Sequence, residues 1–181
     1  MVNAIKQYHP LLECINKRRS IRKYTAEPVE SADILMLIKS GIMAPSGSNI
    51  QPWKFVVVDD PHILKMIISV SPGINGKPPC LLVLCSDQEL AMRKGGKLGR
   101  EYLALMDVCM AAENIMLVAT DIGLGTCAVK SFEASLVQRI LNLPEFIQPE
   151  LIISIGYSNE NVAAPKRRPL EEVVFHNTWN R

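Results

Sequence analysis

Apolar positions spaced three and four residues apart alternate along this chain with short, continuous apolar runs. The helical spacing predicts five helices, around residues 11–15 and over residues 30–43, 61–69, 98–121 and 134–141. Ser31 is the expected N-cap of the second helix, which must end before Ala44-Pro45 because the residue before a proline disfavours helical geometry. The stretch 98–121 is apolar on most sides, so it is expected in the core or at a subunit interface.

The continuous apolar runs predict strands over residues 53–58, 80–85, 126–129 and 151–155, of which the first two are expected to be buried. Residues 71–79 and 92–97 are expected to be exposed loops. No GxGxxG follows the first strand, and helices and strands do not alternate regularly, so a Rossmann domain is not supported. The sequence predicts an α+β fold, with a small mixed sheet among helices, in a single domain over residues 1–181.

Composition excludes several classes of function. The 181 residues hold 20 Lys and Arg against 18 Asp and Glu, and a net charge of +2 is too small to favour a nucleic-acid partner. No uninterrupted apolar run is long enough for a membrane span, and the first ten residues lack the apolar core of a secretory signal, so a cytoplasmic protein is expected. The 5 cysteines are scattered without metal-ligand spacing, which favours reduced thiols and no metal.

Three polar clusters could carry chemistry. Residues 18–23 (RRSIRK) offer guanidinium and hydroxyl donors that suit a phosphate, and residues 45–53 (PSGSNIQPW) suit the polar edge of a planar ligand. Residues 165–169 (PKRRP) form a third, basic cluster. Each also has a plainer interpretation, as a basic helix end, a connecting loop and a basic surface tail.

Few other residues suggest catalysis. The three histidines are isolated, and Cys127 has no partner that the sequence can assign, so no catalytic residue is predicted. Asp107, Glu113 and Asn114 are polar on a mostly apolar helix, and a subunit interface or a ligand could supply the partners that buried polar groups need.

Taken together, the motifs resemble those of the nitroreductase family of flavoproteins. The chain carries an RRSxR-like stretch at residues 18–22, a PSxxNxQPW-like loop at residues 45–53, a helix ending in GLGTC at residues 123–127, and a basic element with proline at residues 166–169. Their order and spacing cover almost the whole chain. The resemblance implies an α+β fold with a central mixed sheet and a homodimer that binds FMN at its interface.

The resemblance also assigns residues to the cofactor. Arg18, Ser20, Lys166 and Arg168 would hold the FMN phosphate and ribityl chain, and Arg22 would lie near the flavin N1/O2 edge. A loop from the other subunit would cover the ring with Pro45, Ser46, Gly47 and Asn49. Backbone N–H groups near Lys130 and Ser131 would face flavin N5. Two flanking residues, Arg19 and Gln51, complete the cofactor contacts. The C-terminal VVF would be an arm that adds a strand to the partner's sheet.

The function implied is an FMN-dependent NAD(P)H oxidoreductase, with NADH or NADPH as donor, that reduces nitroaromatics, quinones or similar planar acceptors by a ping-pong hydride mechanism. A cation near N1/O2 would stabilise the reduced, anionic flavin. Two alternatives stay open. One is a flavin-fragmenting or reductively dehalogenating enzyme on the same fold, and the other is a non-catalytic flavin-binding module.

Overall fold

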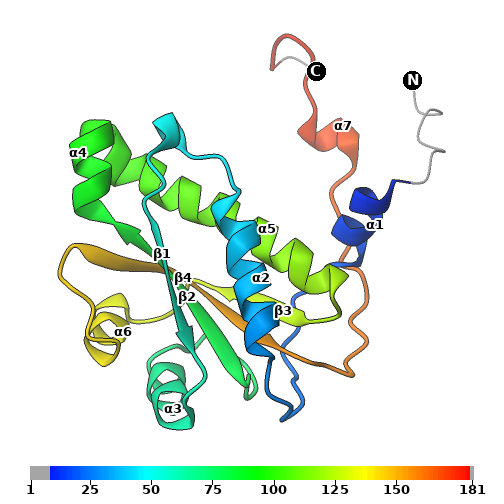
Figure 1. The fold of residues 1–181 in the computed structure, drawn as a ribbon. Helices are drawn as coiled ribbons and strands as arrows, with labels where there is room; N and C mark the ends of the chain where they lie inside the picture. The colour runs from blue at the N-terminus through cyan, green and yellow to red at the C-terminus, as the bar shows by residue number, and fades with distance from the viewer. Residues whose placement is uncertain (1–8, 180–181) are drawn as a thin grey trace.

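The computed structural model describes residues 9–179, in which helices surround one four-stranded sheet (Figure 1). The helices are α1 (Pro10–Lys17), α2 (Ser31–Ile42), α3 (Pro61–Ser69), α4 (Gln88–Leu98), α5 (Ala104–Asp121), α6 (Ala134–Ile140) and α7 (Leu170–Val173), with a 3-10 turn η1 (Gly47–Asn49) and a π-helical turn η2 (Gly99–Leu103). The strands are β1 (Trp53–Val58), β2 (Cys80–Asp87), β3 (Gly125–Val129) and β4 (Ile147–Gly156). The predicted α+β class is confirmed.

The sheet has the order β1-β2-β4-β3, and each neighbouring pair of strands is antiparallel. Among the described residues, its one parallel element is an isolated bridge between Ser20 and Thr126, which lays the segment after α1 along the outer side of β3. The sheet is therefore mixed only through this bridge. The other edge strand, β1, has no partner on its outer side within residues 9–179.

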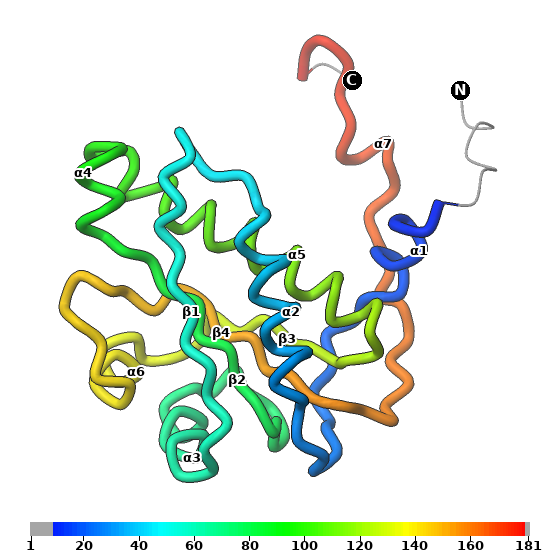
Figure 2. Tube along the Cα trace, in the orientation of Figure 1, coloured from blue at the N-terminus to red at the C-terminus, as the bar shows by residue number. Residues whose placement is uncertain are grey.

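Successive side chains of β2 point to opposite faces of the sheet, and each face carries its own hydrophobic core. Leu82 and Leu84 pack with residues of α2 and α5, whereas Leu81 and Val83 pack with residues of α3 and α6. This follows from the two-residue period of a strand, which sends successive side chains to opposite faces. Figures 1 and 2 show α2 and α5 together on one side and α3 and α6 on the other. The prediction that residues 80–85 form a buried strand is confirmed.

Three local predictions are wrong. Residues 92–97 lie in α4 and not in a loop, because Asp87 caps the helix by accepting a hydrogen bond from the Leu90 N–H at 2.8 Å, and only Gly96 leaves helical geometry, at φ +60°. The N-cap of α2 is Glu30, so Ser31 is already inside the helix. Residues 53–58 form the predicted strand, but it is a half-exposed edge strand.

The helical stretch Gln88–Asp121 is long and apolar enough to cross a membrane, by length and composition alone. Its C-terminal part, α5, packs instead against β2, β3 and β4 and supplies much of one core. The same composition is expected of a central core helix, because such a helix is apolar on the faces that meet the sheet and its neighbours.

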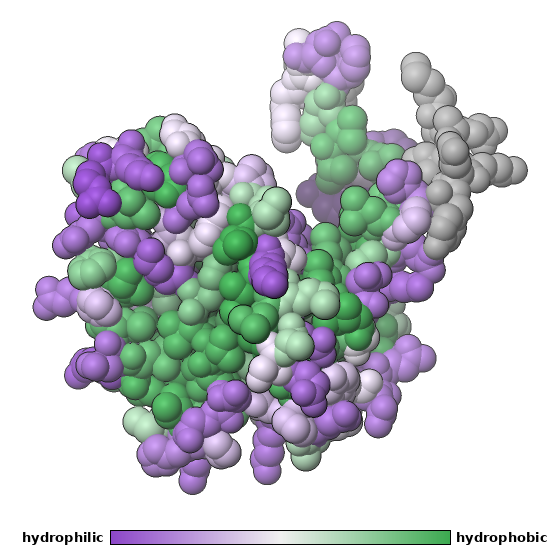
Figure 3. Space-filling view, viewed as in Figure 1, coloured by the Kyte–Doolittle hydropathy of each residue, from purple (hydrophilic) through white to green (hydrophobic). Residues whose placement is uncertain are grey.

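The outer surface keeps several apolar areas. Figure 3 shows one such area over β1 and α2, where a groove is lined by Leu35, Ile38 and Val57. A second follows one side of η2 and α5, where the exposed side chains are Tyr102, Leu105, Met106 and Met110. The C-terminal segment projects away from the sheet beside α1 and also exposes apolar residues (Figures 1 and 2): Leu170, Val173, Val174 and Trp179.

Candidate functional site

The basic segment after α1 is held between that helix and the edge of the sheet. The Ile21 N–H donates to the Thr126 carbonyl at 2.8 Å, next to the bridge between Ser20 and Thr126. A side chain added at Gly125 would meet Ile21 within 3 Å, so the glycine is what lets the segment approach β3 this closely. The fold thus fixes the backbone of the predicted phosphate-binding residues.

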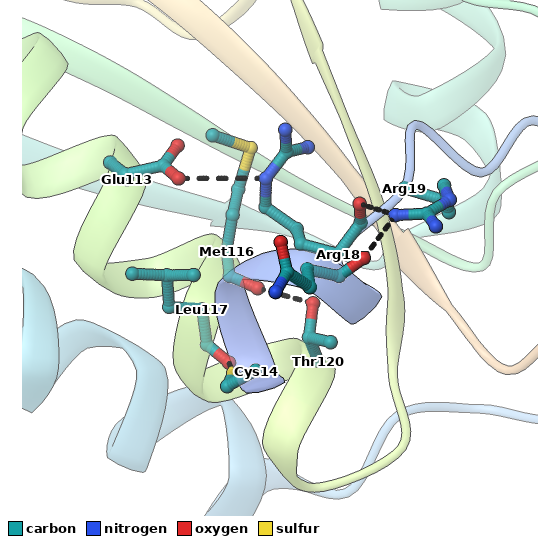
Figure 4. Close-up of polar contacts among 8 residues, drawn as sticks. Cys14, Arg18, Arg19, Glu113, Met116, Leu117 and Thr120 are labelled. Carbon is teal, nitrogen blue, oxygen red and sulfur yellow. Dashed lines mark hydrogen bonds and ion pairs between the residues drawn. The ribbon is translucent and has the colours of Figure 1, made fainter. Parts of the chain in front are cut away.

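Arg18 and Arg19 point in opposite directions (Figure 4). The Arg18 Nε lies 3.5 Å from the Glu113 carboxylate of α5, and this arginine is mostly buried. Arg19 turns back onto α1, where its guanidinium donates to the carbonyls of Asn16 at 2.6 Å and Arg18 at 2.8 Å. Carbonyls at a helix C-terminus lack partners within the helix, so Arg19 caps α1, and Arg18 is the arginine oriented by a carboxylate.

Ser20 and Arg22 complete this basic site. Ser20 is half-buried, and its carbonyl accepts a hydrogen bond from the exposed Arg22 guanidinium at 3.3 Å. The Arg22 N–H donates to the Glu160 carboxylate at 3.3 Å, which ties the segment to the chain leaving β4. Arg18, Ser20 and Arg22 therefore lie along one short stretch beside β3.

The predicted ring-covering loop, residues 45–51, has an unusual backbone. Ser48, Asn49 and Gln51 all have positive φ, at 49°, 55° and 54°. Non-glycine residues rarely adopt this region, and clusters of such residues occur at ligand sites. The Gln51 N–H donates to Ser46 Oγ at 3.2 Å, and the Gln51 side-chain amide donates to Asn49 Oδ1 at 2.8 Å. Pro45 is exposed at its start.

This loop is anchored to α5 by Asp107, whose role the sequence did not assign. Asp107 Oδ1 accepts the Gly47 N–H at 3.0 Å, and the residue is only 1% exposed. Burial raises the pKa of the Asp107 carboxyl, and the hydrogen bond from Gly47 partly opposes that shift. A polar residue on an apolar helix was the sequence signal, but its partner is 60 positions away.

Lys130 and Ser131 directly follow β3, at the end opposite the bridge with Ser20. The Lys130 ammonium lies 3.4 Å from the Glu150 carboxylate, which also accepts the Ser86 hydroxyl at 2.7 Å. The Ser131 carbonyl accepts the Gly73 N–H at 3.2 Å. Their own N–H groups donate to no acceptor within residues 9–179, so both remain available to a ligand. Glu150, buried beside them, is a residue that the sequence reasoning missed.

The third cluster lies apart from the first two. Lys166 and Arg168 are exposed on the extended C-terminal segment, and the Arg168 Nε pairs with Glu172 at 3.0 Å inside that segment. No hydrogen bond or ion pair joins either residue to Arg18, Ser20 or Arg22 in the described part of the chain. The loop 45–51 is likewise tied to the N-terminal part of α5, whereas Arg18 meets its middle.

An open cavity of about 730 Å³ separates α1 from the chain that leaves β4. It is lined mainly by polar and charged residues, Arg19 and Glu160 among them. Arg19 Nε is buried there and has no hydrogen-bond partner in residues 9–179, and neither has the nearby Thr126 Oγ1. Buried polar groups normally have partners, so these atoms have unused hydrogen-bonding capacity beside the RRSxR segment.

The residues present suit FMN. A phosphate needs several cationic and hydroxyl donors, which Arg18, Ser20 and Arg22 supply from one fixed segment. A flat ring needs a rigid cover and N–H donors at its edge, and the strained loop 45–51 and the free N–H groups after β3 are of these kinds. Among residues 9–179, no group of three or more His, Cys, Asp or Glu is placed to hold a metal ion.

None of the five cysteines, which all lie within residues 9–179, is paired in a disulfide. Burial raises the pKa of the Cys80 and Cys85 thiols to about 12. Cys127 is also buried, with its Sγ directed at the neighbouring Ala128 carbonyl at 3.7 Å. Thiols in such surroundings pack as small apolar groups and are poor nucleophiles.

Comparisons with known proteins agree with the motifs. The FMN reductase (NADPH) of Bacillus subtilis is 28% identical over 186 residues, covering 93% of this chain and 74% of that protein. The iodotyrosine deiodinase of Thermotoga neapolitana is 24% identical over 188 residues, covering 93% of this chain and 98% of that protein.

A crystal structure from Parabacteroides distasonis, described as an NADH dehydrogenase/NAD(P)H nitroreductase, matches the fold with a TM-score of 0.83 and 28% identity, covering 95% of this chain and 100% of that chain. The profile described as "Nitroreductase family" matches residues 15–71 and 69–157, from α1 to the end of β4. The resemblance predicted from the motifs is thereby confirmed: this chain belongs to the nitroreductase family and shares its fold and its oxidoreductase character.

Proposed function

We propose that this chain is an FMN-dependent NAD(P)H oxidoreductase that reduces nitroaromatics, quinones or similar planar acceptors. One observation carries the proposal. The segment 18–22 and the N–H groups of Lys130 and Ser131 lie at the two ends of β3. Lys130 lies four positions after Thr126 along β3, a span of roughly 13 Å at about 3.3 Å per residue. An elongated ligand with a phosphate at one end and a ring at the other can bridge such a span.

In this arrangement the phosphate would lie at Arg18 and Ser20. Glu113 holds the Arg18 side chain in one orientation before any ligand arrives, which lowers the entropy that binding must remove. Arg22, two residues after Ser20, is exposed and would face the flavin N1/O2 edge. A cation at that edge favours the reduced, anionic flavin. Lys166 and Arg168 would join the phosphate when the C-terminal segment is fixed in the assembly.

The loop 45–51 would cover the ring of a second subunit, because in its own subunit it is anchored to a different part of α5 from Arg18. A homodimer is supported by the exposed apolar side chains along η2 and α5, which include Tyr102 at 59% and Met106 at 55%. Apolar areas of this kind on one face are typical of interfaces.

The C-terminal segment supports the same assembly. Val173 and Val174 are exposed, and up to residue 179 the segment makes no strand contact with its own sheet. The outer side of β1 offers unpaired backbone groups, and an exposed strand edge readily pairs with a strand from another chain. The resemblance implies an arm that adds a strand to the partner's sheet, and we infer that the β1 edge of the partner receives it.

When bound, FMN would accept a hydride from NADH or NADPH and deliver it to the acceptor. The protein residues need supply no acid or nucleophile for this. They bind the phosphate, orient the ring and leave one face of it open, so that donor and acceptor use the same face in turn. Ping-pong kinetics are the expected consequence.

The experiment is to purify the protein, record its visible absorption spectrum, and titrate it without oxygen using NADH and then NADPH. The expected result is a flavin spectrum that either nucleotide bleaches and that a nitroaromatic or quinone restores, on a protein whose mass by light scattering is that of a dimer. A protein that takes up no added FMN, or whose flavin neither nucleotide reduces, would refute the proposal.

The similarity to an iodotyrosine deiodinase favours a second candidate, reductive removal of halide from an aromatic substrate. The same reduced protein is mixed with an iodotyrosine, and released iodide is measured against nitroaromatic reduction. Iodide release that is faster than nitroaromatic reduction would favour the second candidate over the first.

A further inference from the structure

The strained backbone of the loop 45–51 needs something to hold it. Left-handed conformations at Ser48, Asn49 and Gln51 persist only where the surroundings overdetermine them. The two side-chain hydrogen bonds inside the loop, which both involve Gln51, are exposed to solvent, and two backbone bonds join Asn49 to Ser46 and Ile50 to Gly47. They shape the loop, but they do not fix it to the body of the protein.

Asp107 supplies a polar attachment, beside the apolar one that the buried Ile50 makes. Its Oδ1 accepts the Gly47 N–H at 3.0 Å from within the buried side of α5. One turn earlier on the helix, Leu103 Cδ1 would lie 2.7 Å from a side chain added at Gly47, so the loop backbone rests directly on the helix. The hydrogen bond from Gly47 to Asp107 and the close contact with Leu103 thus both fix the position of Gly47.

Asp107 also has hydrogen-bonding capacity to spare. Its Oδ2 is buried and has no partner within the described residues. Its whole side chain is buried, so the carboxyl group is held in an apolar setting at a cost in free energy. A costly buried group beside a strained functional loop suggests a role that an apolar residue could not fill.

We propose that Asp107 is a positioning residue that holds the loop 45–51 in its strained shape over the flavin ring. The inference rests on the proposed function, in which this loop covers the ring bound by the partner subunit. Asp107 touches neither cofactor nor substrate. It acts through the Gly47 N–H, and the loop in turn limits how the ring tilts and how easily FMN leaves.

The chain offers a matched control on the same helix. Asn114 of α5 donates from its side-chain amide to the Ser40 carbonyl at 3.2 Å, so this hydrogen bond ties α5 to α2 and not to the loop. Asp107→Leu and Asn114→Leu each remove one side-chain tie to another backbone. Asp107→Asn keeps an oxygen that can accept the Gly47 N–H.

The test compares these three variants with the wild type, as the reconstituted flavoprotein, by FMN dissociation constant, visible circular dichroism of the bound flavin, and kcat and KM. Asp107→Leu is expected to weaken FMN binding roughly 5- to 150-fold, the range for leaving one buried donor unpaired, and to change the dichroism of the ring. Asn114→Leu lowers the melting temperature but leaves both flavin signals unchanged, and Asp107→Asn restores most of the affinity.

Two outcomes would overturn the inference while leaving the proposed function intact: equal flavin effects in Asp107→Leu and Asn114→Leu, or an Asp107→Asn variant as impaired as Asp107→Leu. A wild-type protein that binds no FMN overturns both together. If Asp107→Leu does not fold, Asp107→Ser, whose hydroxyl is too short to reach Gly47, replaces it with the same expected result and the same criteria.

Discussion

Replacing Arg18 by alanine is the most direct test of the phosphate site. The arginine is already oriented by Glu113, with 3.5 Å between Nε and Oε1, so it can donate to a phosphate without losing much side-chain freedom. A hydrogen bond to a charged group contributes about 1.5–3 kcal/mol, which corresponds to a rise of roughly 10- to 150-fold in the FMN dissociation constant.

Stability should change far less than binding. The ion pair between Arg18 and Glu113 is partly exposed, with 48% of the Glu113 side chain accessible, and pairs of this kind contribute at most about 1 kcal/mol. For a chain of this size that corresponds to a fall of less than about 4 °C in melting temperature. The two magnitudes separate a loss of binding from a loss of folding.

The assay is fluorescence titration of the apoprotein with FMN and with riboflavin, which lacks the phosphate. Arg18→Ala should weaken FMN binding and leave riboflavin binding nearly unchanged. Lys17→Ala is the matched control, because it removes a charge one residue away that is exposed and paired with Glu13 at 2.6 Å. Adding Arg168→Ala should weaken FMN further if the C-terminal segment joins the site.

Either of two results would refute the reasoning. If Arg18→Ala weakens FMN and riboflavin equally, Arg18 does not recognise the phosphate, and the basic segment 18–22 is a solvated helix end. Unchanged affinity for both ligands leads to the same conclusion. A loss limited to the Lys17 control would place the phosphate on the other side of α1.

Three further outcomes are expected. Folding raises the pKa of Cys80 and Cys85 from 9.0 to about 12, so the native state holds these protons more tightly and the free energy of unfolding should fall as pH rises above 9. Urea unfolding at pH 8 and pH 10 measures this fall. A Cys85→Ala variant whose free energy of unfolding falls equally steeply would contradict the reasoning. Gly41→Val should lower that free energy by about 1–3 kcal/mol, because an added Cβ would lie 2.8 Å from Ile115 Cδ1, and Ile115→Ala in the same chain should recover part of the loss in chemical denaturation. A chain that ends at Pro169 should dissociate more readily in sedimentation velocity, since it lacks the exposed apolar end, and an equally tight dimer would argue against arm exchange.

Local pattern was a good guide to the elements of this protein. The period of the apolar residues located α2, α3, α5 and α6 and all four strands to within a few residues, because each element buries one face or both. It failed at α4, where Gly95-Gly96 suggested a loop. There the Asp87 cap and the buried Ala91 hold the helix, and neither depends on the glycine pair.

The motifs likewise indicated the family and two pieces of the candidate site, because short segments such as residues 18–22 and 45–51 carry their donors and turn residues within themselves. The positions of these segments relative to one another could not be predicted from the sequence. Only the tertiary structure distinguished the two arginines: Arg18 pairs with a carboxylate on α5, whereas Arg19 donates to the carbonyls at the end of α1.

The sequence alone thus determined which segments are helix, strand or polar site, since those properties depend on neighbours within a few residues. The tertiary structure alone decided that Asp107 holds the loop through Gly47, and that Glu150 supports the end of β3. Each contact joins residues far apart in the chain. Such pairs form only because packing α5 and β4 against the rest of the protein brings the buried carboxyl groups of Asp107 and Glu150 within reach of their partners, and no local period records that.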